Sequence, residues 1–161
     1  MMKRIYPLLL LGLAGLACLV APLAAKGSGK PELRVTTLDG ASFDLAAQRG
    51  KWVIVNYWAT WCRPCIHEMP ALSGFVKSRP DVTAIGLAYQ DGAASAIKAF
   101  LARHPVSYPV ARVDTAHPPA AFGAPLGLPT TYLIAPDGRV AKRFVGPVTP
   151  SDLEAVIGHR K

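Results

Sequence analysis

Residues 53–65 read Val-Ile-Val-Asn-Tyr-Trp-Ala-Thr-Trp-Cys-Arg-Pro-Cys. A nearly continuous apolar run, typical of a β-strand buried on both faces, leads directly into Cys62 and Cys65. Residues 66–72 follow and predict a helix. Two cysteines with this spacing at the start of a helix indicate a redox-active dithiol. The helix dipole and the unpaired backbone N–H groups of the first turn favour the thiolate of Cys62, which is the nucleophilic form.

Other uses of this cysteine spacing fit the sequence less well. A zinc ribbon needs a second cysteine or histidine pair, and the third cysteine, Cys18, lies in an N-terminal apolar stretch. Covalent haem attachment needs a histidine directly after the second cysteine, where Ile66 stands. A structural disulfide remains an alternative, although so short a loop constrains the unfolded chain little.

A copper site is a further alternative, because thiolates, His67 and Met69 would suit Cu(I). His67 and Met69 are successive odd positions, which do not share a helix face, so this copper site is disfavoured. We expect no metal ion and no cofactor.

The N-terminal 25 residues have the pattern of an export segment. Lys3 and Arg4 precede residues 5–25, which carry no charge. This run would measure about 31 Å as a helix, so a cleaved signal peptide and a retained membrane anchor both stay open. We expect residues 1–25 to be this segment, 26–30 a linker and 31–161 one domain. The predicted location is periplasmic or otherwise extracytoplasmic, either soluble after cleavage or anchored to the inner membrane.

The composition limits the classes of partner. The 161 residues suffice for one domain, and 51% of them are apolar. The net charge is +8, but the lysines and arginines are scattered and form no basic block. We therefore expect no nucleic-acid partner. No oligomer interface is visible in the sequence, and we expect a monomer.

The order of predicted elements indicates an α/β fold. A hairpin is expected over residues 33–45, around the turn signal Asp39-Gly40. Strands alternating with helices favour a central sheet with helices on both faces. The predicted strands are residues 51–57, 82–88, 110–113, 130–135 and 140–145, and the predicted helices are residues 62–79, 93–103 and 149–158, with a helical turn at 118–122.

Aromatic residues are assigned to two environments. We expect Trp58 and Trp61 to pack around the dithiol, and Phe75, Phe100 and Phe122 to lie in the core.

The motifs together resemble a known family. Trp61-Cys62-Arg63-Pro64-Cys65, then Glu68 and Pro70, then residues 127–132 (Gly-Leu-Pro-Thr-Thr-Tyr) are similar to the thioredoxin fold. More narrowly, they resemble the TlpA/ResA group of exported thiol–disulfide reductases, over residues 31–158. The resemblance implies a thioredoxin-like fold with a central mixed sheet flanked by helices, an N-terminal β-hairpin and an inserted strand–helix unit.

The resemblance also implies roles for individual residues. Cys62 would be the exposed attacking cysteine and Cys65 the buried resolving one. Pro129 would be the cis-proline facing the dithiol, which leaves the Leu128 backbone to pair with an extended substrate peptide. Trp61 would contact the substrate.

Three further residues are expected to adjust the dithiol. Asn56 stands where cytoplasmic thioredoxin has a proton-transferring aspartate, and the resemblance assigns that task to Glu68. Cys65 and Glu68 are three apart and share a helix face; the alternative is a solvated glutamate. Arg63 and Pro64, between the cysteines, are expected to tune the redox chemistry, because a cation favours the thiolate of Cys62. Arg63 could equally be a docking charge or a bystander.

The resulting hypothesis is a periplasmic thiol–disulfide oxidoreductase that reduces disulfides of exported proteins. The resemblance points to cytochrome c maturation or copper-site assembly, with apocytochrome c or a copper chaperone as substrate and a membrane electron donor of the DsbD/CcdA type. Alternatives are a disulfide oxidase or isomerase of the same fold, since the reduction potential sets the direction, and a non-catalytic module that binds a haem protein or copper chaperone.

Overall fold

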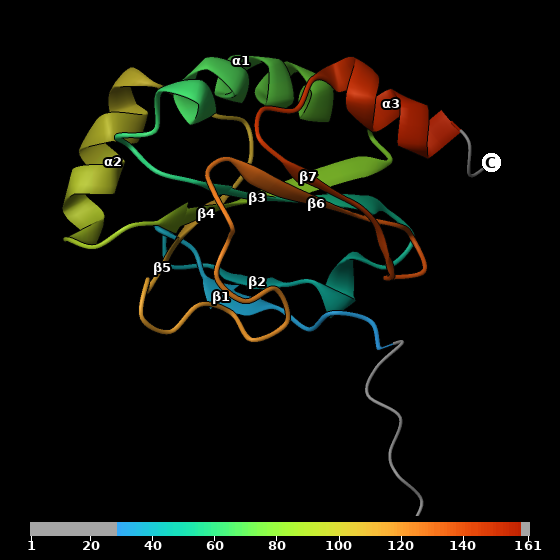
Figure 1. Ribbon diagram of the computed structural model, residues 1–161, viewed down its shortest axis with the longest axis horizontal. Helices are drawn as coiled ribbons and strands as arrows, with labels where there is room; N and C mark the ends of the chain where they lie inside the picture. Colours follow the sequence, from blue (N-terminus) through green and yellow to red (C-terminus); the bar gives the residue numbers. More distant parts are fainter. Residues whose placement is uncertain (1–28, 159–161) are drawn as a thin grey trace, which may run out of the picture.

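The computed structural model describes residues 29–158 (Figure 1). The predicted export segment and most of the predicted linker lie outside these residues. Within residues 29–158, no helix has the length and apolar character needed to cross a bilayer.

The chain begins with the predicted hairpin. Strands β1 (Arg34–Thr36) and β2 (Ser42–Asp44) pair antiparallel. The connecting loop spans residues 37–41 and is longer than the two-residue turn that Asp39-Gly40 suggested. The reason is that the N–H and hydroxyl groups of Thr37 both donate to the carbonyl of Ala41 (2.8 and 2.9 Å), which closes the loop there.

A mixed five-stranded sheet forms the centre of the molecule. Strand β3 (Trp52–Trp58) lies in the middle and pairs in parallel with β4 (Val82–Tyr89), which pairs in parallel with β5 (Val110–Val113). On its other side, β3 pairs antiparallel with β6 (Thr130–Ile134), and β6 with β7 (Val140–Val145). The helices are α1 (Arg63–Ser78), α2 (Ala94–Arg103) and α3 (Pro150–Gly158), with a 3₁₀ turn η1 (Ala46–Gln48) after the hairpin.

All three α-helices cover the same face of this sheet (Figure 1). Side chains alternate along β3, so that Ile54 and Trp58 pack under the helices while Val55 and Tyr57 point to the opposite face. The expectation of helices on both faces is therefore wrong. The hairpin supplies the second apolar layer, since Leu33, Phe43 and Leu45 pack against the sheet where a helix was expected.

The local signals at the helix ends are confirmed. The backbone N–H of Asp152 donates to Thr149 Oγ1 (3.3 Å), and the Asp152 carboxylate accepts from the N–H of Thr149 (2.9 Å), so Thr149 caps α3. Phe75 and Phe100 are buried in the helix-side core as predicted, whereas Phe122 is only half-buried and packs on the ring of Tyr132.

Gly86 allows a close approach between β4 and the aromatic core. It lies opposite Asn56 in the β3–β4 ladder. A Cβ atom added to Gly86 would meet Trp58 Nε1 at 3.0 Å and the ring of Tyr108 at 3.3 Å. We predict that Gly86→Ala lowers the free energy of unfolding by about 1–3 kcal/mol, because the two rings must shift in a packed core.

Guanidinium chloride unfolding of the oxidised protein would measure this effect. Gly74→Ala is the matched control, because Gly74 lies on the exposed side of α1 with nothing within 4 Å of an added Cβ. That substitution should raise the free energy of unfolding by about 0.5–1 kcal/mol. A Gly86→Ala variant with an unchanged free energy of unfolding would contradict the close packing at this position.

Candidate active site

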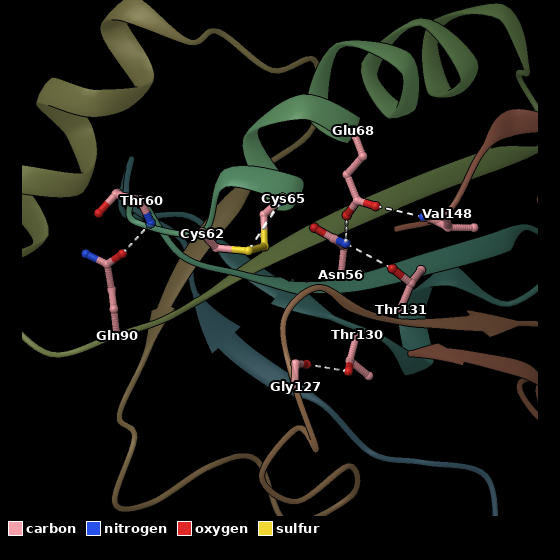
Figure 2. Close-up of a disulfide and its surroundings, with 10 residues drawn as sticks. All are labelled: Asn56, Thr60, Cys62, Cys65, Glu68, Gln90, Gly127, Thr130, Thr131 and Val148. Carbon is pink, nitrogen blue, oxygen red and sulfur yellow. Dashed lines mark hydrogen bonds between the residues drawn. A yellow bond between two sulfur atoms is a disulfide. The ribbon is translucent and has the colours of Figure 1, made fainter. Parts of the chain in front are cut away.

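The two cysteines lie at the junction between the central strand β3 and helix α1. Strand β3 ends at Trp58, and the N–H of Cys62 closes a turn by donating to the carbonyl of Ala59 (3.1 Å). Cys62 is the N-cap of α1, and its Sγ accepts from the N–H of Cys65 (3.3 Å). The two sulfurs form a disulfide (Figure 2). The predicted strand, dithiol and helix are thus arranged as expected.

Both cysteines are largely withdrawn from solvent in this oxidised form. Cys65 is 0% exposed and Cys62 is 5% exposed. The expectation of an exposed Cys62 is wrong here, because the bond to Cys65 holds its sulfur against the first turn of α1, in an apolar cluster with Trp58 and Ala59. Cys62 is still the more accessible of the two cysteines.

The remaining residues of the motif lie on the surface. Trp58 packs in the cluster that contains the disulfide, as expected, but Trp61 is 68% exposed and does not pack around the sulfurs. The reason is that Trp61 follows the end of β3 and precedes the helix cap, so neither element buries it. Arg63 and Pro64 are exposed at the start of α1.

The segment before β6 contains the predicted cis bond. The Leu128–Pro129 peptide is cis. Leu128 packs against the apolar cluster that contains both cysteines, and Pro129 is buried. Among the described residues, neither backbone polar group of Leu128 has a hydrogen-bond partner. A donor and an acceptor are therefore available to an extended peptide beside the disulfide.

Glu68 is buried and held by two donors (Figure 2). Its Oε1 accepts from Asn56 Nδ2 (2.8 Å) and its Oε2 from the N–H of Val148 (2.9 Å). The alternative of a solvated helix glutamate is wrong, since Glu68 is only 5% exposed. Burial raises the pKa of Glu68, and the hydrogen bonds from Val148 and Asn56 offset part of that rise.

Asn56 is a functional candidate whose contacts sequence reasoning missed. Its Nδ2 also donates to Thr131 Oγ1 (2.9 Å), the residue opposite it on β6. In Figure 2 the Asn56 amide lies between Glu68 and the disulfide. Its Oδ1 is buried and has no hydrogen-bond partner among residues 29–158. The signal was an amide inside an otherwise apolar strand, which needs buried partners. No sequence signal indicated Gln90, whose Oε1 accepts from the N–H of Thr60 (2.7 Å) just before the dithiol.

The copper-site alternative is not supported by the helix geometry. His67 is exposed and Met69 is 2% exposed, so the two side chains lie on opposite sides of α1. Within residues 29–158, no group of three or more His, Cys, Asp or Glu residues could hold a metal ion.

Comparison with known proteins identifies the family. The family model described as Redoxin matches residues 25–157. The chain belongs to the Redoxin family. It is 32% identical to the thiol-disulfide oxidoreductase ResA of Bacillus cereus over 132 residues, covering 81% of this chain and 76% of the relative. It is 30% identical to the thioredoxin-like protein YneN of Bacillus subtilis, over 80% of this chain and 76% of that protein.

Solved structures agree with this assignment. A thiol:disulfide interchange protein of the thioredoxin family from Chlorobium tepidum superposes with a TM-score of 0.70 at 30% identity, covering 80% of this chain and 92% of that one. A DsbF homologue from Corynebacterium diphtheriae gives a TM-score of 0.69 at 29% identity, covering 80% and 84%. The Redoxin-family chain is therefore a thiol–disulfide oxidoreductase with a thioredoxin-like fold. The predicted fold and the predicted class of enzyme are both confirmed.

The Asn56 amide should lower the pKa of Glu68. Asn56→Leu removes the donor to Oε1, so we predict a higher Glu68 pKa than in the wild type. Carboxyl-resolved ¹³C NMR titration of the oxidised protein would measure it. Thr131→Val is the control, since it leaves the bond between Asn56 and Glu68 in place and should change the pKa less. An unchanged or lower pKa in Asn56→Leu would contradict the proposed contact.

Glu68 should also make stability depend on pH. Because its pKa is raised in the folded protein, its contribution to stability is complete below the pKa of the unfolded chain and is lost as the pH rises through the folded pKa. We predict that the stability of Glu68→Gln relative to the wild type rises as the pH increases from about 4, near the ordinary glutamate pKa, through the raised folded pKa of Glu68. Urea unfolding across this range, with the exposed Glu32→Gln as background, would test it. A stability difference independent of pH would contradict a raised pKa.

Proposed function

We propose that this oxidoreductase reduces disulfides of exported proteins outside the cytoplasm, in the periplasm, by exchange at Cys62 and Cys65. The observation that carries the proposal is the disulfide at the start of α1 beside the backbone of Leu128, which has no hydrogen-bond partner among residues 29–158. This arrangement offers a reversible two-electron centre together with a place to hold a substrate chain.

The proposed reaction runs through a mixed disulfide. The Cys62 thiolate attacks one sulfur of a substrate disulfide, forms a bond to it and releases the other substrate sulfur as a thiolate. Cys65, as the thiolate, then attacks Cys62 Sγ and releases the second substrate thiol. Two electrons pass to the substrate, and the protein is left with the Cys62–Cys65 disulfide. A membrane donor of the DsbD/CcdA type would return two electrons.

Glu68 is the proposed proton acceptor for Cys65. The resolving thiol must lose its proton before it attacks, and no solvent reaches Cys65 in the oxidised form. Glu68 lies three residues further along the same helix and is buried as well. Its raised pKa makes the carboxylate a stronger base than a solvated glutamate, which suits proton exchange with a thiol.

The substrate would bind as an extended segment across the cis-proline turn. The N–H and C=O groups of Leu128 would pair with its backbone, and the exposed Trp61 would contact its side chains. Arg63, exposed at the positive end of α1, would favour the Cys62 thiolate, and Pro64 fixes the first turn of that helix.

The biological setting is proposed from the family alone. Cytochrome c maturation or copper-site assembly would supply substrates such as apocytochrome c or a copper chaperone. Residues 1–25 would direct export and be cleaved or serve as an inner-membrane anchor.

The alternatives differ in direction or in turnover. An oxidase or isomerase would use the same dithiol at a higher reduction potential. A non-catalytic binding module is disfavoured, because both cysteines are present and bonded to each other.

Two cysteine variants test the proposed reaction. With dithiothreitol as electron source, we predict that Cys62→Ser reduces an oxidised model protein at least about 100-fold more slowly than the wild type, since the nucleophile is lost. Pre-reduced Cys65→Ser, after removal of dithiothreitol, should accumulate a mixed disulfide between Cys62 and the substrate, visible by intact-mass spectrometry, because the variant lacks the resolving thiol. Full rescue of a deletion strain by Cys62→Ser would instead support the binding module.

A further inference from the structure

We propose that a groove beside the disulfide selects substrates with a lysine or arginine close to the attacked cysteine, held between Trp61 and Asp91. This inference rests on the proposed function and specifies its substrates. The groove has a volume of about 360 Å³, and its walls include Trp61, Tyr89, Asp91, Thr115 and Leu128.

The groove lies between the two segments that flank the dithiol. Trp61 immediately precedes Cys62, and Leu128 immediately precedes the cis Pro129. A peptide paired with the Leu128 backbone would therefore place a side chain neighbouring its cysteine over this groove. The bond from the Thr60 N–H to Gln90 (2.7 Å) ties the loop carrying Trp61 to the end of β4, next to Asp91 (Figure 2). The backbone segments that carry the two proposed contact residues are thus tied to each other.

The walls combine aromatic surface with a single carboxylate. Trp61 is 68% exposed, so its ring is free to stack. The Tyr89 hydroxyl donates to the carbonyl of Thr115 (3.0 Å), and Thr115 Oγ1 donates to Asp91 Oδ1 (2.5 Å). These bonds orient Asp91 and leave its Oδ2 available. No ion pair within residues 29–158 uses Asp91.

This combination fits a cationic side chain best. A lysine or arginine can lie over the ring of Trp61 and donate to the Asp91 carboxylate, which gains a charged partner. A glutamate at the same place would face Asp91 with a like charge. Among the described residues, no lysine or arginine lines the groove to neutralise Asp91.

The overall charge of the protein cannot produce the same preference. The chain carries a net charge of +8, so its long-range field disfavours cationic substrates. A preference for lysine must therefore come from a local contact. Because this contact would lie at the surface, the preference for lysine should become smaller at high salt without disappearing.

Matched peptides test the proposal. Three disulfide-containing peptides would be identical except for lysine, glutamine or glutamate beside the cysteine, and their reduction by the pre-reduced protein would be followed by stopped flow. We expect the rate constants to fall from lysine to glutamine to glutamate, with about a tenfold ratio between the first and last.

Substitutions assign the preference to the groove. Asp91→Asn should lower the ratio of the rate constants for the lysine and glutamate peptides to about twofold or less. Asp91→Lys should make the glutamate peptide react faster than the lysine peptide. Asp137→Asn is the control, because Asp137 is also an exposed carboxylate and lies in the β6–β7 turn, which contributes no residue to the groove. It should leave the ratio unchanged.

The outcomes separate this inference from the proposed function. Equal rates for the three peptides, or a preference for lysine that persists in Asp91→Asn, would contradict the proposed selectivity of the groove. Either result would still be compatible with disulfide reduction at Cys62 and Cys65. A wild-type protein that reduces none of the peptides and no protein disulfide would overturn both.

Discussion

The buried carboxylate of Glu68 is the contact on which the arrangement of the site depends. It accepts hydrogen bonds from Asn56 of β3 and from Val148 just before α3, while Asn56 also donates to Thr131 of β6. Leaving a buried charged or polar group without partners is costly, so these bonds favour one position of α1 on the sheet. The dithiol at the start of α1 takes its position from that contact.

The same contact connects the fold with the chemistry. A disulfide-exchange centre needs one sulfur that a substrate can reach and a second that attacks only after the mixed disulfide has formed. We propose that placing both cysteines at the start of α1 provides this order, because Cys62 caps the helix and Cys65 lies within it. Glu68, one turn further along, is buried as well and is the base that we propose for the second step.

Local signals in the sequence were sufficient for most of the fold and for the dithiol. The apolar run before Cys62, the cap at Thr149 and the motif around Pro129 each specify their own structure, and the cis bond expected from the family is present. Long-range choices were not predictable. A strand buried on both faces does not reveal whether a helix or the hairpin with Phe43 covers it.

The reduction potential of the Cys62–Cys65 pair tests the central claim, disulfide reduction, most directly. It would be measured by equilibrating the protein against a series of glutathione or dithiothreitol buffers and quantifying the oxidised fraction. A reductase supplied with electrons from the membrane should have a value close to that of thioredoxin, about −270 mV. A value close to that of the strong oxidant DsbA, about −120 mV, would contradict the account and make the protein a disulfide donor.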